Sequence, residues 1–365
     1  MAKALGPALT EMHLYRFTLC YPYFRARLEW LSGPDYAAAY PAIDKHVFNR
    51  LSPYGTDFFY YFPYAYLFRE LGVGPLNEFG MRIDKKLGAF SNRASNHKLV
   101  VVYGGSAAWS LDCLHSEMFS FRLEVKLNEW AAASSRGMTF SVLNMGQHGN
   151  VVMNEIINHV LFADQLAPDI VIAHDGFNDL VYGVVCDTAL LSQHQICYQH
   201  NLEEWSQILH ATGDRPGNHQ GEKIYAIKNT PHAILSAYLN RKKQLSDMVT
   251  AKGGKFIWGL QPFVESKAEM HPEEIAWKNR AQDDQRDLGN GFANAKMLLD
   301  ALSGHLSKMD IDNVDLHRSF QRLGAEQHIF VDNVHLSPEG DDLIADEYFS
   351  FIRQRIENGR WFADA

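Results

Sequence analysis

Short apolar runs recur along the chain from Lys98 onward, and each is followed by a glycine-rich or polar stretch. Continuous apolar runs of this length are typical of parallel strands buried on both faces, with helices between them. The pattern therefore predicts an α/β fold whose central, open parallel sheet is covered by helices on both faces. The predicted strands are Leu99–Tyr103, Phe140–Leu143, Ile170–Ala173, Phe256–Leu260 and Val314–Leu316.

Helical periodicity appears between these runs, over 117–130 and 151–166, and again from about Pro338 to Ile356. In the last segment, Ser337 is a suitable N-cap and Pro338 suits the first turn. One face of this expected helix is apolar, and it consists of Leu343, Ile344, Tyr348, Phe351, Ile352 and Ile356.

Two parts of the chain do not fit the strand-and-helix alternation. Residues 1–97 are rich in aromatics, above all over 57–68, and contain several Gly and Pro breaks. They predict an irregular, partly helical extension that packs on the main domain at 98–358, because aromatic side chains carry a large apolar area. A stacking platform for a sugar or another planar ligand is the alternative. About 80 residues separate the third and fourth strands, so the excess at about 181–229 predicts a lid-like insertion.

Composition narrows the class of partner. The 365 residues are 46% hydrophobic and 21% charged, as in a globular protein of one large or two smaller domains. A formal net charge of −9, with no long Lys/Arg run, argues against a nucleic-acid or anionic-membrane surface and favours a small or neutral partner. The four cysteines are scattered, which is typical of buried free thiols. No apolar run of membrane-spanning length and no leader pattern occur, so a cytoplasmic location is expected.

Two groups of residues have side chains that could bind a metal. His194, Cys197 and His200 follow one another at intervals of three, but side chains at this spacing diverge on a helix and a fourth ligand is not evident. Asp175 and Asp179 could form a pair, yet nothing else at a recognisable spacing completes a site. We therefore expect no metal and no organic cofactor.

Ligands of an open parallel sheet bind beyond the carboxyl ends of its strands. Ser106 follows the first strand after two glycines, which leave little bulk beside its hydroxyl and place it at an expected helix N-terminus. Gly146 follows the second strand, where a bare backbone N–H can approach an oxyanion. Asn178 follows the third and could donate a hydrogen bond without titrating. Each residue alone fits a helix cap or an ordinary turn equally well.

A fourth polar segment precedes the expected last helix. Asp332 and His335 stand three residues apart there, a spacing at which a carboxylate could orient an imidazole general base. A polar turn before a capped helix is the alternative for this pair taken by itself. We expect His335 to be partly exposed at the edge of the sheet.

Together, and in this order, the four segments resemble the signature blocks of the SGNH (GDSL-like) hydrolase superfamily. The resemblance spans roughly 70% of the chain and rests on the motifs only. It implies a flavodoxin-like, three-layer α/β/α fold and acyl chemistry, with Ser106 as nucleophile, His335 as base and Asp332 as its orienting carboxylate. The oxyanion hole would consist of the Ser106 and Gly146 N–H groups and the Asn178 amide. The first block departs from the founding pattern, since Gly-Gly-Ser replaces Gly-Asp-Ser. The second block also contains Gly149, and Gly146 is preferred because it is nearer the strand.

The resulting hypothesis is a serine esterase that cleaves a small-molecule or saccharide ester through an acyl-enzyme. One alternative is O-acyl transfer to, or deacetylation of, a saccharide or small natural product, because hydrolysis and transfer share the same intermediate. Another is a non-catalytic binding module of the same fold, against which the complete set of five residues counts. Candidate substrate contacts flank the four blocks or follow the fourth strand, and they are Trp109, His148, Phe177, Tyr182 and Gln261.

Overall fold

The computed structural model describes residues 59–62, 65–68, 81–83, 86–147, 149–185, 229–283 and 288–362. The chain divides into two compact units, one formed by 85–192 with 225–365 and the other by 1–84 with 193–224. Every described element of the predicted α/β fold lies in the first of these units.

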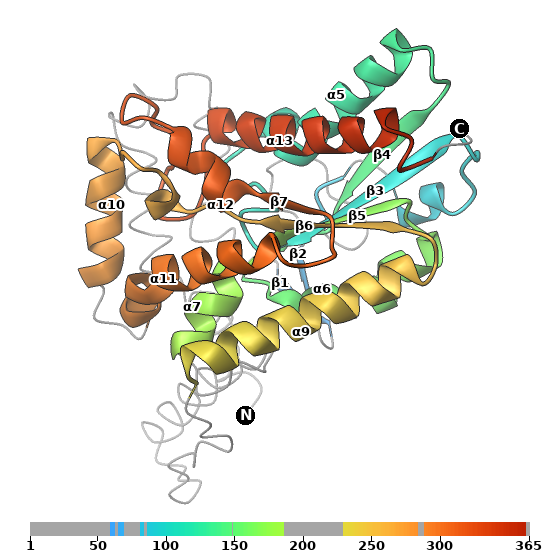
Figure 1. Ribbon diagram of the computed structural model, residues 1–365. Coiled ribbons are helices and arrows are strands. Elements are labelled where there is room, and N and C mark those ends of the chain that lie inside the picture. The colour runs from blue at the N-terminus through green and yellow to red at the C-terminus, as the bar shows by residue number, and fades with distance from the viewer. Residues whose placement is uncertain are drawn as a thin grey trace, which may run out of the picture. The chain divides into compact units, whose positions relative to one another are not determined.

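Five parallel strands form the central sheet of this unit (Figure 1). The predicted strands are confirmed, with bounds that differ by at most a few residues, and Leu316 begins a short helix instead of ending the last strand. The strand order is β4-β3-β5-β6-β7, which is 2-1-3-4-5 when the strands of this sheet are counted alone and is the flavodoxin-like order. The strands are β3 (His97–Gly104), β4 (Thr139–Asn144), β5 (Ile170–Asp175), β6 (Lys255–Leu260) and β7 (Asn313–Asp315).

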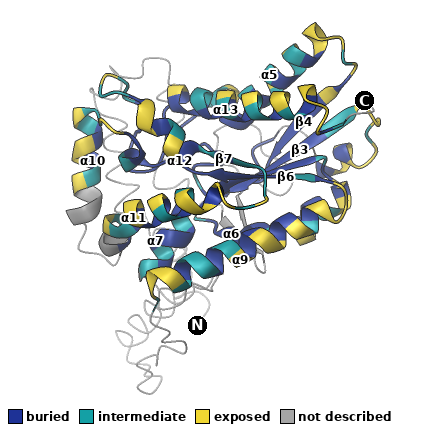
Figure 2. Cartoon of the chain, in the orientation of Figure 1, coloured by how far each residue is buried: buried dark blue, intermediate teal, exposed yellow. Residues whose placement is uncertain are grey.

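Helices cover both faces of the sheet, as a three-layer fold requires. Helices α5 (Phe119–Ala133) and α13 (Pro338–Glu357) lie on one face (Figure 1). The other face is covered by α6 (Val152–Asn158), α7 (Phe177–Val185), α9 (Pro231–Thr250) and α11 (Leu288–Leu306). The sheet between the two layers is almost entirely buried, while exposed residues gather on the outer helix faces (Figure 2). The remaining described α-helices are α10 (Pro272–Asp283) and the short α12 (Leu316–Ser319), and 3-10 turns lie at Leu87–Phe90, His115–Glu117, Val264–Ser266 and Phe320–Arg322.

The last helix begins where the sequence predicts. The Ser337 hydroxyl accepts a hydrogen bond from the Gly340 N–H at 3.3 Å, and Pro338 occupies the first turn. Four of the six predicted apolar positions are fully buried and the other two are half-buried. The helix expected over 151–166 is less regular, since α6 continues into a π-helical turn at His159–Ala163 and a 3-10 turn at Asp164–Leu166. His159 lies within hydrogen-bonding distance, 3.1 Å, of the Tyr103 hydroxyl.

The aromatic run of the N-terminal extension contains two strands that the sequence pattern did not predict. Strands β1 (Phe59–Phe62) and β2 (Ala65–Phe68) pair in an antiparallel manner. Aromatic side chains favour strands because they pack well along a pleated surface. Most of the remaining extension, most of the predicted insertion, and the His194, Cys197 and His200 group lie outside the described residues. Within the described residues, no helix combines the length and the apolar content needed to cross a bilayer.

Candidate active site

The sheet topology brings the four predicted segments to one edge. All five strands run in the same direction, so their carboxyl ends meet there, and the strand order reverses between β3 and β5. Ligands bind at such switch points. Ser106 follows β3 by two residues and Asn178 follows β5 by three, so the switch point separates the candidate nucleophile from the candidate amide donor.

The Ser106 turn depends on the glycine that ends β3. Gly104 has φ of +147°, a conformation that residues with a side chain rarely adopt, and a Cβ there would collide with the His174 carbonyl oxygen. The chain then follows a series of turns, with Trp109 N–H donating to the Gly105 carbonyl at 3.0 Å, and the next helix, α5, begins only at Phe119. The expected helix N-terminus at Ser106 is therefore wrong, because residues 106–112 form consecutive turns and not a continuous helix. Ser106 is half-buried.

The Asp332–His335 loop owes its shape to the Asp332 carboxylate. Asp332 Oδ1 accepts hydrogen bonds from the backbone N–H groups of Val334 and His335, both at 2.7 Å. Val331 N–H donates to the His335 carbonyl at 3.0 Å and closes the turn. The same carboxylate therefore folds the loop and, through Oδ2, holds the imidazole. This dual role accounts for the spacing of three residues between the two side chains.

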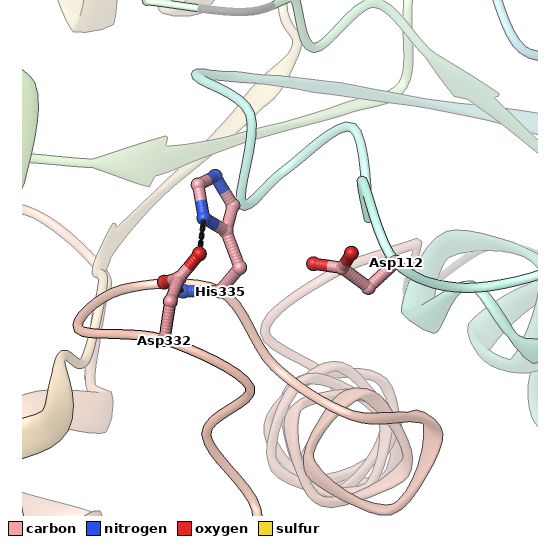
Figure 3. A group of neighbouring side chains, drawn as sticks. All are labelled: Asp112, Asp332 and His335. Atoms are coloured by element: carbon pink, nitrogen blue, oxygen red, sulfur yellow. Dashed lines mark hydrogen bonds and ion pairs between the residues drawn. The ribbon is translucent and has the colours of Figure 1, made fainter. Parts of the chain in front are cut away.

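Three side chains form a continuous hydrogen-bonded series. His335 Nδ1 lies 2.7 Å from Asp332 Oδ2, drawn as a dashed line in Figure 3, and His335 Nε2 lies 2.5 Å from Ser106 Oγ. Because a carboxylate only accepts, Nδ1 carries the proton and Nε2 is left free to accept from the serine hydroxyl. The imidazole is only 7% exposed and Asp332 is fully buried. His335 is thus more enclosed than the sequence suggested, because it lies between its two partners.

Asn178 lies in the first turn of α7 and faces the Ser106 turn. Its Nδ2 donates to the Asn150 carbonyl at 2.8 Å, which leaves one amide hydrogen for a further acceptor. A Cβ added at Gly105 would lie closer than 3.0 Å to this Nδ2, a separation that Cβ atoms essentially never show. Any side chain at this position, where glycine replaces the Asp of the first block, would therefore have to displace the Asn178 amide.

Gly146 is close to the Ser106 turn, but its N–H is already engaged. It donates to Asn144 Oδ1 at 2.9 Å, and a Cβ at Gly146 would press on the backbone of Ala108 and Trp109. Asn144 Nδ2 donates in turn to the Ala108 carbonyl at 2.8 Å. Asn144 therefore fastens the second loop to the first. Sequence reasoning missed this residue, although a buried polar residue directly ending an apolar run was a usable signal.

The five candidate substrate contacts differ in their surroundings. Trp109 is completely buried, and Phe177 is 3% exposed with its ring 5.5 Å from that of Phe263, so both pack in the interior. Gln261 is also buried, and its N–H continues the sheet by donating to the Asp175 carbonyl. Tyr182 is half-buried, and His148 lies outside the described residues.

A second carboxylate lies beside the Asp332–His335 pair. The carboxylate of Asp112 reaches toward it from the turn that follows Ser106 (Figure 3), and one ligand atom from each of the three residues falls within 4.8 Å of the others. Such a trio could hold a cation in principle. Both His335 nitrogens and both Asp332 oxygens already have partners, however, so a metal here would break the series that leads to Ser106. Nothing in the sequence pointed to Asp112, because its irregular turn has no recognisable period.

Buried charges support the segments that carry these groups. Glu274 accepts hydrogen bonds from the N–H groups of Ile329 and Phe330, both at 3.1 Å, and pairs with the fully buried Lys267 at 2.6 Å. In the first turn of α13, Asp341 accepts a hydrogen bond of 2.9 Å from the N–H of Phe119, the first residue of α5. Burial raises the pKa of Asp341 to about 6, although hydrogen bonds from Ser110 and Phe119 oppose this shift.

Comparison with known proteins gives structural neighbours but no sequence relatives. No protein-family model matches the chain, and no curated protein matches it. Among solved structures, an α/β hydrolase, LAE5, from a Lake Arreo metagenome shares 15% identity over 72% of this chain and 97% of its own, with a TM-score of 0.41. The acetylxylan esterase Axe2 of Geobacillus stearothermophilus shares 15% over 70% and 94%, with a TM-score of 0.38.

A third solved structure, described as a GDSL-like lipase from Parabacteroides merdae, shares 14% identity over 70% of this chain and 94% of its own, with a TM-score of 0.37. The chain is similar to these structures.

Proposed function

We propose that the chain is a serine esterase that cleaves an O-acyl or related ester through an acyl-enzyme. The observation that carries this proposal is the series Ser106 Oγ, His335 Nε2, His335 Nδ1 and Asp332 Oδ2, with distances of 2.5 and 2.7 Å. A serine hydroxyl is a weak nucleophile at neutral pH, and an adjacent general base activates it. The enclosed imidazole is already in the tautomer that such a base needs.

In the proposed mechanism, Ser106 Oγ attacks the ester carbonyl carbon while its proton passes to His335 Nε2. Asp332 holds the ring and stabilises the imidazolium that forms. The tetrahedral intermediate then expels the alcohol, which takes the proton from Nε2, and leaves an acyl group on Ser106. Water enters the vacated position, gives a proton to His335 and attacks the acyl carbonyl. Collapse of the second intermediate releases the acid and returns the proton to Ser106.

The oxyanion of each intermediate needs donors that point at the carbonyl oxygen. The Ser106 N–H makes no hydrogen bond within the described residues, and Asn178 has one amide hydrogen left. Each such donor contributes on the order of 3 kcal/mol to the transition state. Gly146 would have to release Asn144 before it could serve. Gly149, with φ of +65°, is the other glycine in that loop and our alternative third donor.

A covalent probe tests the proposal directly. A fluorophosphonate should label the wild-type chain at Ser106, and Ser106→Ala should abolish both labelling and the cleavage of a short-chain aryl ester. Ser134→Ala, between the end of α5 and the amino end of β4, serves as a matched control because the same substitution is made at an exposed position on the opposite edge of the sheet. A wild-type chain that is neither labelled nor active on aryl esters would refute the assignment.

Hydrolysis and acyl transfer differ in the nucleophile of the second step, where a saccharide hydroxyl could replace water. Adding candidate acceptor alcohols to the aryl ester assay and measuring the ratio of transfer product to free acid decides between the two outcomes. A panel of donors with different acyl chains and leaving alcohols would then define the substrate, for which a small-molecule or saccharide ester is proposed.

A further inference from the structure

Two neighbouring residues of α7 hold the same short segment, residues 150–152, which leads into the start of α6. Asn178 Nδ2 donates to the Asn150 carbonyl at 2.8 Å, and both carboxylate oxygens of Asp179 lie 3.2 Å from the Val152 N–H. Val152 is the first residue of α6, so Asp179 satisfies one of the backbone N–H groups that a helix start leaves without an intrahelical partner. Two bonds, two residues apart, thus fix segment 150–152 against the start of α7.

We propose that Asp179 is a positioning residue, whose ionised carboxylate holds segment 150–152 in place and thereby fixes the direction in which the Asn178 amide points. The link runs through the Asn150 carbonyl, which occupies one of the two amide hydrogens and so sets where the other one lies. This inference rests on the proposed esterase function, in which that second hydrogen stabilises the oxyanion. Asp179 itself touches no reacting atom.

The surroundings of Asp179 make its charge sensitive to pH. It is 8% exposed and faces Asp175 at the end of β5, Glu155 on α6, and Lys242 and Arg241 on α9. Lys242 is already paired with Asp175 and lies 3.0 Å from Glu155, so its charge is shared. Burial and the nearby Asp175 carboxylate raise the pKa of Asp179 to about 7, against the opposing effects of Lys242, the Val152 N–H and Arg241.

A protonated Asp179 loses the charge that strengthens its bond to the Val152 N–H, and charge-assisted bonds are about twice as strong as neutral ones. The contact between Asp179 and the Val152 N–H, which holds segment 150–152, should therefore weaken as the pH falls through 7. Full turnover then needs an ionised Asp179 in addition to a working base, so kcat of the wild type should fall more steeply on the acid side than kcat of a variant in which residue 179 cannot titrate. Asp179→Asn is neutral at every pH and should remove the part of the fall that is due to position 179.

The experiment is a pH profile of kcat and KM for an aryl ester, measured on wild type and Asp179→Asn. We expect a plateau kcat about tenfold lower in the variant, an unchanged KM, and a less steep fall of kcat on the acid side. Glu155→Gln is the matched control, because it changes a carboxyl of the same buried cluster that has no bond to Val152. The kcat of Glu155→Gln should fall on the acid side as steeply as that of the wild type. When Asn178→Ala is already present, adding Asp179→Asn should lower kcat little further, because the effect of Asp179 passes through the Asn178 side chain.

Two failures can be told apart. If fluorophosphonate labels the wild type at Ser106 but Asp179→Asn retains the wild-type plateau and slope, the positioning role is wrong and the esterase proposal stands. If the wild type is neither labelled nor active, the esterase proposal fails and the positioning role fails with it. An Asp179→Asn variant whose loss is equal with and without Asn178 would show that Asp179 acts on the fold alone, and would also overturn the inference.

Discussion

Gly105→Ala is the sharpest test of the site geometry, because it adds one methyl group beside the Asn178 amide. Gly105 does not have a positive φ, so alanine can adopt the backbone. The new Cβ would lie closer than 3.0 Å to Nδ2, and the amide has to retreat by about 1 Å to reach ordinary contact. An oxyanion donor works only within a narrow distance range, and losing one costs about 3 kcal/mol, or roughly a hundredfold in kcat.

The assay is steady-state cleavage of an aryl ester by four proteins: wild type, Gly105→Ala, Asn178→Ala and the double variant. Each single variant should lower kcat by a similar factor with little change in KM, and the double variant should be no worse than Asn178→Ala. Gly304→Ala, which has nothing within 4 Å of its new Cβ, is the control and should retain full activity. If Gly105→Ala costs as much without the Asn178 side chain as with it, the methyl group acts elsewhere and the reasoning is refuted.

Three further predictions concern the base, metals and stability. His335→Gln should lower kcat by several orders of magnitude while circular dichroism stays that of the wild type; turnover near wild type would exclude His335 as the base. Dialysis against EDTA should leave activity unchanged, whereas a loss that Zn²⁺ restores would contradict a mechanism carried by Ser106, His335 and Asp332. The raised pKa of Asp341, about 6 against 3.8, means that the native state holds its proton more tightly than the unfolded state. The free energy of unfolding should therefore fall by about 2 kcal/mol as pH rises from 4 to 6, and Asp341→Asn should remove this part of the fall in denaturant titrations. If the free energy of unfolding of Asp341→Asn falls with pH as steeply as that of the wild type, this role of Asp341 is refuted.

The parallel strands could be predicted because each is buried on both faces and leaves a continuous apolar run in the sequence. The position of Ser106 and Asn178 after those strands followed from the rule that sites lie at the carboxyl ends. The turn after Ser106 could not be predicted, because its backbone is held by contacts distant in sequence, such as Asn144 with Ala108.

The enclosure of His335 and the neighbouring carboxylate of Asp112 also escaped the sequence. Both depend on how the loop after the last strand packs against the turn after the first, and no local pattern encodes that contact. The engagement of the Gly146 N–H was hidden for a similar reason, since it is set by the rotamer of Asn144.

The candidate nucleophile and the candidate base are 229 residues apart in sequence, and the base lies directly before α13. A chain emerging from the ribosome in amino-to-carboxyl order would therefore carry Ser106 long before His335 could activate it. Under the proposed function, hydrolysis should begin only when the segment that holds Asp332 and His335 has been released and docked, so a nascent chain that ends before this segment remains harmless to esters around it. The same arrangement makes esterase activity a reporter of the long-range contact between the first and last of the four segments.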